Sequence, residues 1–373
     1  MGGSAFSAIL AASAFPRLPP AVYQALKAKM IPKISQFYTC VGVPLEAPEK
    51  LDYGDLDLLV TIPAPGFGAA VPHDAIRKAI GAKYANEMEG NRTSNYAVPI
   101  RVGEWGSLGH GTDEKEKRAI ADNGEIYYQV DIHNCIDKAE YSRVSFFNSY
   151  GDLGMILGLI ARNSGLALGV KGLKLPNPPN PPLHLTDSFD DITSFFGLSL
   201  QTYNKGFKTK KEVYEWAVST KYFDPAQFRS SGLGFTKVKP QRTMYSDFVT
   251  WVEMSNASHL PNKPRISREC RHAKVREEAL IYFNKKQEFE ALSKARSDRS
   301  RLKESFSGSL VRDWTKLGEC GKGVKLIMDE VRRRLGGEDG VLEYLDKHGE
   351  DGVKKFVREV QVDLGIQSNA GRC

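Results

Sequence analysis

Three aspartates beside apolar runs are the residues of this sequence whose types and spacing could do chemistry. Asp55 and Asp57 stand at the start of residues 56–62, an apolar run typical of a buried strand. Side chains two residues apart point to the same face of a strand, so their carboxyl groups should lie within about 7 Å of each other. Like charges that close repel, and each raises the pKa of the other. We therefore expect a partner that offsets this repulsion.

Asp131 is the third of these acids and interrupts the β-prone run of residues 125–135. An aspartate in such a run is costly to bury unless it is paired. If this strand lies beside residues 56–62, the three carboxylates converge. Together with water and phosphate oxygens they suit an octahedral Mg²⁺ ion, with Mn²⁺ as the alternative, and two such ions can bridge a phosphoryl centre. In the competing interpretation Asp55 caps a turn, Asp57 faces solvent on an edge strand and Asp131 pairs with a lysine.

The elements that must position these acids follow from hydrophobic spacing and from glycine and proline positions. The polar, glycine-rich residues 106–124 are expected to form an exposed insertion, and from about residue 146 helical spacing prevails. The remaining expected elements are a helix over 20–36, a strand over 37–42, a strand over 55–62, a helix that starts at a proline near residue 72, and strands over 95–102 and 125–135.

The predicted fold class is α+β, in three parts. Residues 1–145 should form an α/β domain with a small mixed sheet, and residues 146–260 a helical domain that binds substrate or nucleotide. Residues 261–373 should form a basic helical extension. Such an arrangement places the three aspartates in the first part and leaves the second to close over them.

The composition of the 373 residues excludes several classes of protein. Hydrophobic residues make up 41% and charged residues 26%, which is ordinary for a soluble protein, and no apolar run reaches the roughly 18 residues of a membrane span. The five cysteines show no CxxC spacing, which argues against a disulfide framework or a zinc site. A reducing compartment, cytoplasmic or nuclear, fits best. The lack of acids before Glu46 raises a mitochondrial presequence as the alternative.

The ordered set of motifs resembles the DNA polymerase β-like nucleotidyltransferase superfamily, and within it a fungal group. The motifs are Gly42 at the end of a strand, GDLDLLV at 54–60 and VDI at 130–132. Three downstream segments also resemble that group, so that the resemblance covers about residues 20–250: these are 148–161, 194–198 and 212–225.

This resemblance implies a nucleotidyltransferase fold and a Mg²⁺-dependent enzyme that moves a nucleoside monophosphate from an NTP to a hydroxyl acceptor, with nucleic acid among the candidate acceptors. Asp55 and Asp57 match the pair that ligates both metal ions. Asp131 matches the third carboxylate, which ligates the catalytic ion beside the attacking hydroxyl. Gly42 and Val43 match the loop that approaches the triphosphate, and Gly54 opens the aspartate motif.

The loop after Gly42 departs from the family pattern. Val43, followed by Pro44, stands where the family has Gly or Ser; valine offers no hydroxyl, and proline offers no amide N–H. Lys50 is a candidate to compensate for these missing triphosphate-binding groups. The departure supports a second hypothesis, a catalytically degenerate protein that binds nucleotide or RNA. A metal-dependent glycosyltransferase is a distant third, because in that class the apolar strand precedes the acids.

Residues 263–303 have helical spacing and contain more Lys and Arg than Asp and Glu. The usual explanation is a solvated helix. If the basic residues share one side, this stretch would contact RNA or DNA. His133 shares the face of Asp131 by alternation, and we expect it to be a packed or hydrogen-bonded histidine.

Overall fold

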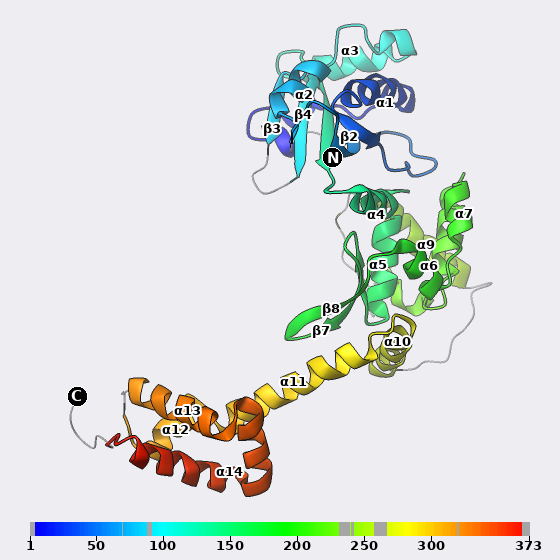
Figure 1. Cartoon of the computed structure of the whole chain (residues 1–373). Coiled ribbons are helices and arrows are strands. Elements are labelled where there is room, and N and C mark those ends of the chain that lie inside the picture. The colour runs from blue at the N-terminus through cyan, green and yellow to red at the C-terminus, as the bar shows by residue number, and fades with distance from the viewer. Residues whose placement is uncertain are drawn as a thin grey trace. The chain divides into compact units, whose positions relative to one another are not determined.

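The structure, a computed structural model, describes residues 4–68, 70–87, 92–230, 239, 242–256, 267–318 and 321–367. The contacts divide the chain into two compact units, Met1–Phe283 and Asn284–Cys373. The first unit is drawn in blue to yellow in Figure 1, and the second in yellow to red. The predicted division between residues 145 and 146 falls inside a single helix, α4 (Lys138–Asn148). This division stays a prediction.

A mixed five-stranded sheet forms the first part of the chain, as predicted. Its order is β1-β2-β5-β4-β3, and only β2 and β5 run parallel among its described strands. The strands are β1 (Tyr38–Gly42), β2 (Leu56–Pro63), β3 (Tyr84–Glu87), β4 (Thr93–Pro99) and β5 (Tyr127–Asn134). The α+β class is therefore confirmed.

One face of this sheet carries the main apolar core. Leu56, Leu58, Val130 and Ile132 alternate along β2 and β5 and are buried against helices α1 (Pro20–Ile34) and α2 (His73–Ile80). Proline occupies the first position of α1. A backbone N–H at this position makes no hydrogen bond within the helix, so proline is tolerated there. The alternation that buries these residues turns Asp57, Gln129 and Asp131 to the opposite face.

Two smaller apolar clusters cover the ends of that opposite face. Phe6 and Phe15 from the N-terminal segment pack with Ala97 and Tyr127 at one end. Val144 of α4 packs with Leu59 and Cys135 at the other. The acidic side chains lie between these clusters, in a part of the sheet that neither cluster covers.

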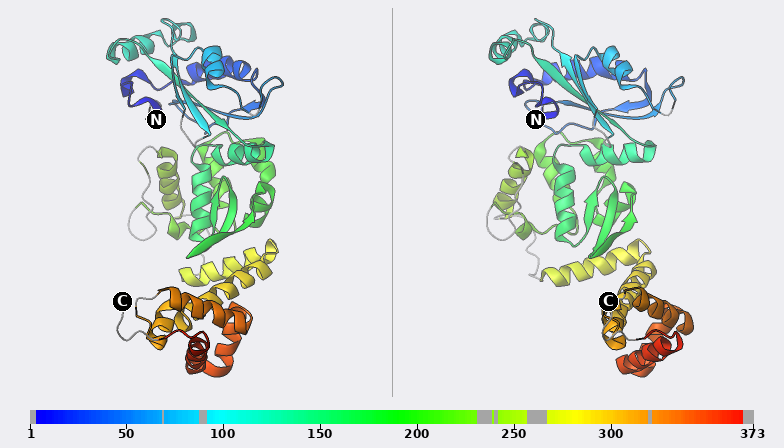
Figure 2. Two further views of the ribbon diagram at one scale, coloured as in Figure 1. Left: turned by 60° about the vertical axis from the view of Figure 1, so that its left-hand side comes forward. Right: turned by 90° about the vertical axis from the view of Figure 1, so that its left-hand side faces the viewer.

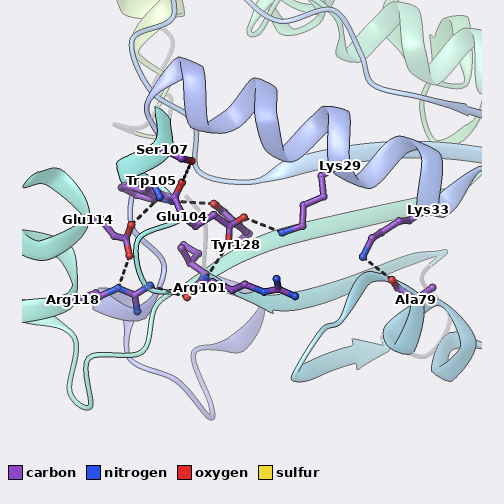
Figure 3. Close-up of polar contacts among 11 residues, drawn as sticks. Lys29, Lys33, Ala79, Arg101, Glu104, Trp105, Ser107, Glu114, Arg118 and Tyr128 are labelled. Atoms are coloured by element: carbon purple, nitrogen blue, oxygen red, sulfur yellow. Dashed lines mark hydrogen bonds and ion pairs between the residues drawn. The ribbon is translucent and has the colours of Figure 1, made fainter. Parts of the chain in front are cut away.

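Residues 106–124 are not simply an exposed insertion, which corrects the prediction. They form helix α3 (Gly111–Ile120), and Glu114 of this helix is buried. Its carboxylate accepts hydrogen bonds from Trp105 N–H and Arg118 Nε, both at 2.8 Å (Figure 3), and from Gly103 N–H at 2.8 Å. These bonds fix the turn that buries the Trp105 side chain, whose Nε1 donates to Tyr128 Oη at 3.0 Å.

The region after residue 146 is not entirely helical. Strands β6 (Ala167–Gly169), β7 (Gly172–Asn177) and β8 (Asn180–Thr186) form a second, antiparallel sheet, with β6 in contact with α5 (Leu153–Asn163) (Figure 2). The proline-rich segment makes the β7–β8 hairpin, with Pro178 and Pro179 in its turn, because the alternating leucines of both strands are buried on one side. The helices that follow are α6 (Phe189–Phe196), α7 (Leu200–Lys205), α8 (Lys210–Val218), α9 (Thr243–Asn256) and α10 (Arg268–Tyr282).

The second unit consists of helices with their own apolar core. Val311, Ile327, Val331 and Val357 lie at the centre of this core. Its helices are α11 (Lys286–Ser305), α12 (Gly308–Thr315), α13 (Gly321–Leu335) and α14 (Glu338–Asp363), the last broken at Gly349.

None of the helices in the described ranges is by itself long and apolar enough to cross a bilayer. The pair α4 and α5 reaches the required length and composition only when joined, and a 90° bend separates the two helices.

Candidate active site

The structure places the two strands that carry the acids side by side. Residues Leu56 to Val60 of β2 pair in parallel with Val130 to Asn134 of β5, and Asp57 lies directly opposite Asp131. Paired residues on neighbouring strands point to the same face of a sheet. Asp57 and Asp131 therefore project together from the face opposite the main core.

β2 starts at Leu56, one residue later than the predicted strand start. Asp55 therefore lies just before the strand rather than inside it. Its charge nevertheless acts on both other acids, since it raises the pKa of Asp57 and of Asp131. The three carboxylates thus form one electrostatic group. The competing interpretation, in which Asp131 pairs with a lysine, finds no support in the contacts of Asp131 described here.

Burial and mutual repulsion raise the pKa values of two of these acids. The pKa of Asp57 is raised to about 7, first by desolvation and then by Asp55 and Asp131, with Lys50 acting in the opposite direction. The pKa of Asp131 is raised to about 6 by desolvation, although hydrogen bonds from Asn95 and Gln129 lower it. Both carboxylates therefore ionise reluctantly without a cation beside them.

Asp57 and Lys50 are both open to solvent and yet desolvated. Each is exposed by surface area, while desolvation is the largest cause of the shift in its pKa. Neighbouring protein atoms therefore displace part of the water around both side chains, although neither is covered. The pKa of Lys50 is lowered by this desolvation, and the charge of Asp55 works in the opposite direction.

Lys50 is placed by aromatic side chains, which the sequence alone did not reveal. Its Nζ lies 4.4 Å from the ring centroid of Tyr53, and the Tyr53 ring stacks on Tyr23 of α1 with centroids 3.8 Å apart. A cation over an aromatic face is attracted by the ring quadrupole. This stack holds a basic group close to Asp55 and Asp57, on the loop between β1 and β2.

The end of β1 is packed rather than open. Gly42 lies at the strand end, and a Cβ atom there would lie 2.2 Å from Tyr141 Oη, so Gly42 leaves room for the tyrosine of α4. Val43 packs against the main core, and Pro44 is buried. Gly54 is buried directly before Asp55. The side chain of Val43 thus contributes to packing, in addition to lacking a hydroxyl.

The loop that follows is tied to the helices after residue 145. Leu45 N–H donates to Ser149 Oγ at 2.9 Å, and Tyr150 N–H donates to Leu45 O at 2.6 Å. Further along, Lys210 N–H donates to Glu49 Oε2 at 3.0 Å. The loop that carries Lys50 is thereby joined to both the sheet and the helical region.

The ligand types fit a hard divalent cation, because three carboxylates come from neighbouring strands. Asp57 and Asp131 lie opposite each other on β2 and β5, and Asp55 lies just before β2. Across the described residues, however, no three acidic, histidine or cysteine groups are already arranged as a finished metal cluster. The carboxylate of Asp131 accepts instead from two amides, Asn95 Nδ2 at 2.7 Å and Gln129 Nε2 at 2.9 Å.

Asn95 and Gln129 are site residues that sequence reasoning missed. Both are buried, on the face that also carries Asp131. The signal was present, since an amide two residues before Asp131 in an apolar strand is as unusual as the aspartate itself. His133 interacts through Nδ1 with Thr93 Oγ1 at 2.9 Å, which confirms a hydrogen-bonded histidine, and burial lowers its pKa.

The basic stretch is divided between the two units. Residues 263–266 lie outside the described residues, α10 belongs to the first unit and α11 to the second. Two of its arginines pair with acids, Arg271 with Asp224 at 2.6 Å and Arg301 with Asp346. A nucleic-acid face on this stretch stays a prediction.

Comparisons with known proteins do not identify the chain. No family model matches it, and neither does any curated protein. The function is therefore inferred from the residues of the site.

Proposed function

We propose that this protein is a Mg²⁺-dependent nucleotidyltransferase that moves a nucleoside monophosphate from an NTP to a hydroxyl acceptor. The observation that carries the proposal is the in-register pairing of Asp57 with Asp131 beside Asp55. The order of the motifs, which resembles that of the polymerase β-like superfamily, also supports the proposal. The mixed sheet, with one parallel pair among its described strands, is compatible with that fold.

The electrostatics support a cation as the missing partner. Two carboxylates with pKa values of about 7 and about 6 repel each other in a desolvated setting, and a divalent ion would relieve that repulsion. Asp55, Asp57 and Asp131 are the residues that would hold it. When bound, such an ion activates a hydroxyl and stabilises the developing charge on phosphate oxygens.

The chain's own groups have separate roles in this proposal. Asp55 and Asp57 would hold the cation, and pyrophosphate would be the leaving group when the nucleoside monophosphate is transferred. Asp131, next to them, accepts the proton of the attacking hydroxyl or orients that hydroxyl. Lys50 is close enough to Asp55 and Asp57 to meet the negative charge of the donor. RNA or DNA is a candidate acceptor because residues 263–303 contain more Lys and Arg than Asp and Glu.

A second candidate, a nucleotide- or RNA-binding protein without catalysis, is favoured by the end of β1. Val43 packs against the core, and Tyr141 Oη lies against Gly42, so a triphosphate would not be held there for transfer, and nucleotide or RNA would bind without reacting. Nucleotide binding that ignores Mg²⁺ would distinguish this candidate from the enzyme.

The test is thermal unfolding of the purified chain with each NTP, with and without Mg²⁺. A ligand at about 100 times its Kd adds about 2.7 kcal/mol to the folded state. For a domain of about 200 residues this raises Tm by about 5–10 °C. We expect one or more NTPs to give such a rise only with Mg²⁺, and Asp57→Asn to abolish it.

The matched control is Asp74→Asn, an exposed aspartate of α2 that pairs with Arg77. It should keep the full Mg²⁺-dependent shift. A shift of equal size without Mg²⁺ would favour the binding protein, and the absence of any shift would remove the nucleotide from the proposal.

A further inference from the structure

Asp131 is held by two amide side chains that lie on its own sheet face. Asn95 is its direct partner on β4, and Gln129 precedes it by two residues on β5. Asn95 is 6% exposed and Gln129 is 3% exposed. Buried amides require hydrogen-bond partners, and the carboxylate of Asp131 supplies them.

The two oxygens of the Asp131 carboxylate accept different numbers of these hydrogen bonds. Oδ1 accepts from Asn95 Nδ2 at 2.7 Å and from Gln129 Nε2 at 2.9 Å, whereas Oδ2 accepts only the second Gln129 contact at 2.9 Å among the described side chains. Each carboxylate oxygen offers about two acceptor positions. Oδ1 is therefore fully used, and Oδ2 retains room for one more partner.

We propose that Asn95 and Gln129 are positioning residues that fix the Asp131 carboxylate and present its Oδ2 as the single oxygen available to a divalent cation or to the acceptor hydroxyl. The inference rests on the proposed function, because it assigns the roles of two residues around that site. Three strands contribute to the arrangement, since Asn95, Asp131 and Asp57 occupy one row across β4, β5 and β2.

A fixed carboxylate binds a cation better than a mobile one, because its orientation is already set before binding. Partners that orient metal ligands typically contribute about 10–100-fold to metal affinity. Without the amides, Asp131 would have an unrestrained χ angle at the sheet surface and would bind with either oxygen. The amides themselves need not touch the cation.

The probe is Mn²⁺ alone, titrated into the full chain and followed by the electron paramagnetic resonance signal of the free ion. We compare the unaltered chain with Asn95→Leu and Gln129→Met, which keep the approximate shapes and remove the donors. We expect each to weaken Mn²⁺ binding about 10–100-fold. Melting curves in EDTA establish that the variants are folded, and Gln129→Met is the milder change if Asn95→Leu fails to fold.

Thr61→Val is the control on the same sheet face. Its hydroxyl is buried and makes no hydrogen bond within the described part of the chain, so Mn²⁺ binding should not change. Variants that melt earlier but bind Mn²⁺ with unchanged or higher affinity would give the amides a structural role only and overturn the inference. If the unaltered chain binds Mn²⁺ no better than Asp57→Asn, the proposed function fails as well.

Discussion

Asp57 on β2 lies directly opposite Asp131 on β5, and the pKa of each carboxyl group is raised. Natural sheets avoid like charges at directly paired positions because the pair destabilises the fold. The chain keeps the pair and adds Asp55 at the strand start. This arrangement is the reason that we propose a cation-binding site here.

The acidic pair should make the metal-free chain less stable as pH rises. An aspartate whose folded pKa is raised contributes stability below its unfolded pKa of about 4, and that contribution is lost as pH rises through the folded value. For Asp131 and Asp57 the loss should extend to about pH 6 and about pH 7. Urea unfolding in EDTA across pH 4–8 measures it.

Asp57→Asn should flatten this pH dependence, since it removes one of the two titrating groups and relieves the other. Saturating Mg²⁺ should also flatten it in the unaltered chain. A pH dependence between pH 4 and pH 7 that is the same in Asp57→Asn as in the unaltered metal-free chain would contradict the electrostatic coupling.

Gly42→Ala should destabilise the protein through Tyr141. The new Cβ would lie 2.2 Å from Tyr141 Oη, so the tyrosine or the strand end must shift, at a cost of about 1–3 kcal/mol. In the double variant with Tyr141→Phe the nearest ring atom is Cζ at 3.5 Å, an ordinary contact. Most of the loss should therefore be recovered, as a double-mutant cycle by urea unfolding would measure. Equal losses in the single and double variants would place the conflict elsewhere.

Thr61→Val should stabilise the protein by about 1 kcal/mol. Thr61 Oγ1 is buried with no hydrogen-bond partner among the described residues, and an unpaired buried hydroxyl costs free energy that the isosteric valine avoids. Valine also suits a strand. Thermal or urea unfolding measures the gain, and a loss of stability would reveal a partner for this hydroxyl.

Glu114→Ala should cost about 3 kcal/mol, because it leaves the cation of Arg118 and the N–H groups of Gly103 and Trp105 without their acceptor (Figure 3). Burial alone would raise the pKa of Glu114, but these hydrogen bonds outweigh it, and the pKa is lowered. The stabilisation should therefore be lost as pH falls through that lowered pKa. The control is Glu116→Ala on the exposed side of the same helix, expected to change stability by less than about 0.5 kcal/mol.

The local structure around the site could be predicted from the sequence. Alternating apolar residues fixed the faces of β2 and β5, and proline and glycine marked the ends of α1 and β1, because these signals depend only on neighbours along the chain. The predictions failed where local polarity conflicted with packing. Residues 106–124 looked like an exposed insertion, yet hydrogen bonds to Gly103, Trp105 and Arg118 accompany the burial of Glu114.

The sequence by itself determined that Asp55 and Asp57 stand at the start of one strand and Asp131 within another, and which face each strand buries. Tertiary structure alone decided that Asp57 lies opposite Asp131, that Asn95 and Gln129 hold Asp131, and that Tyr141 occupies the space beside Gly42. The physical reason is that the contacts of Asp131 with Asn95 and Asp57, and of Gly42 with Tyr141, join residues 36 to 99 positions apart, and such contacts depend on the packing of the whole sheet. Spacing along the chain does not determine which strands become neighbours in the sheet.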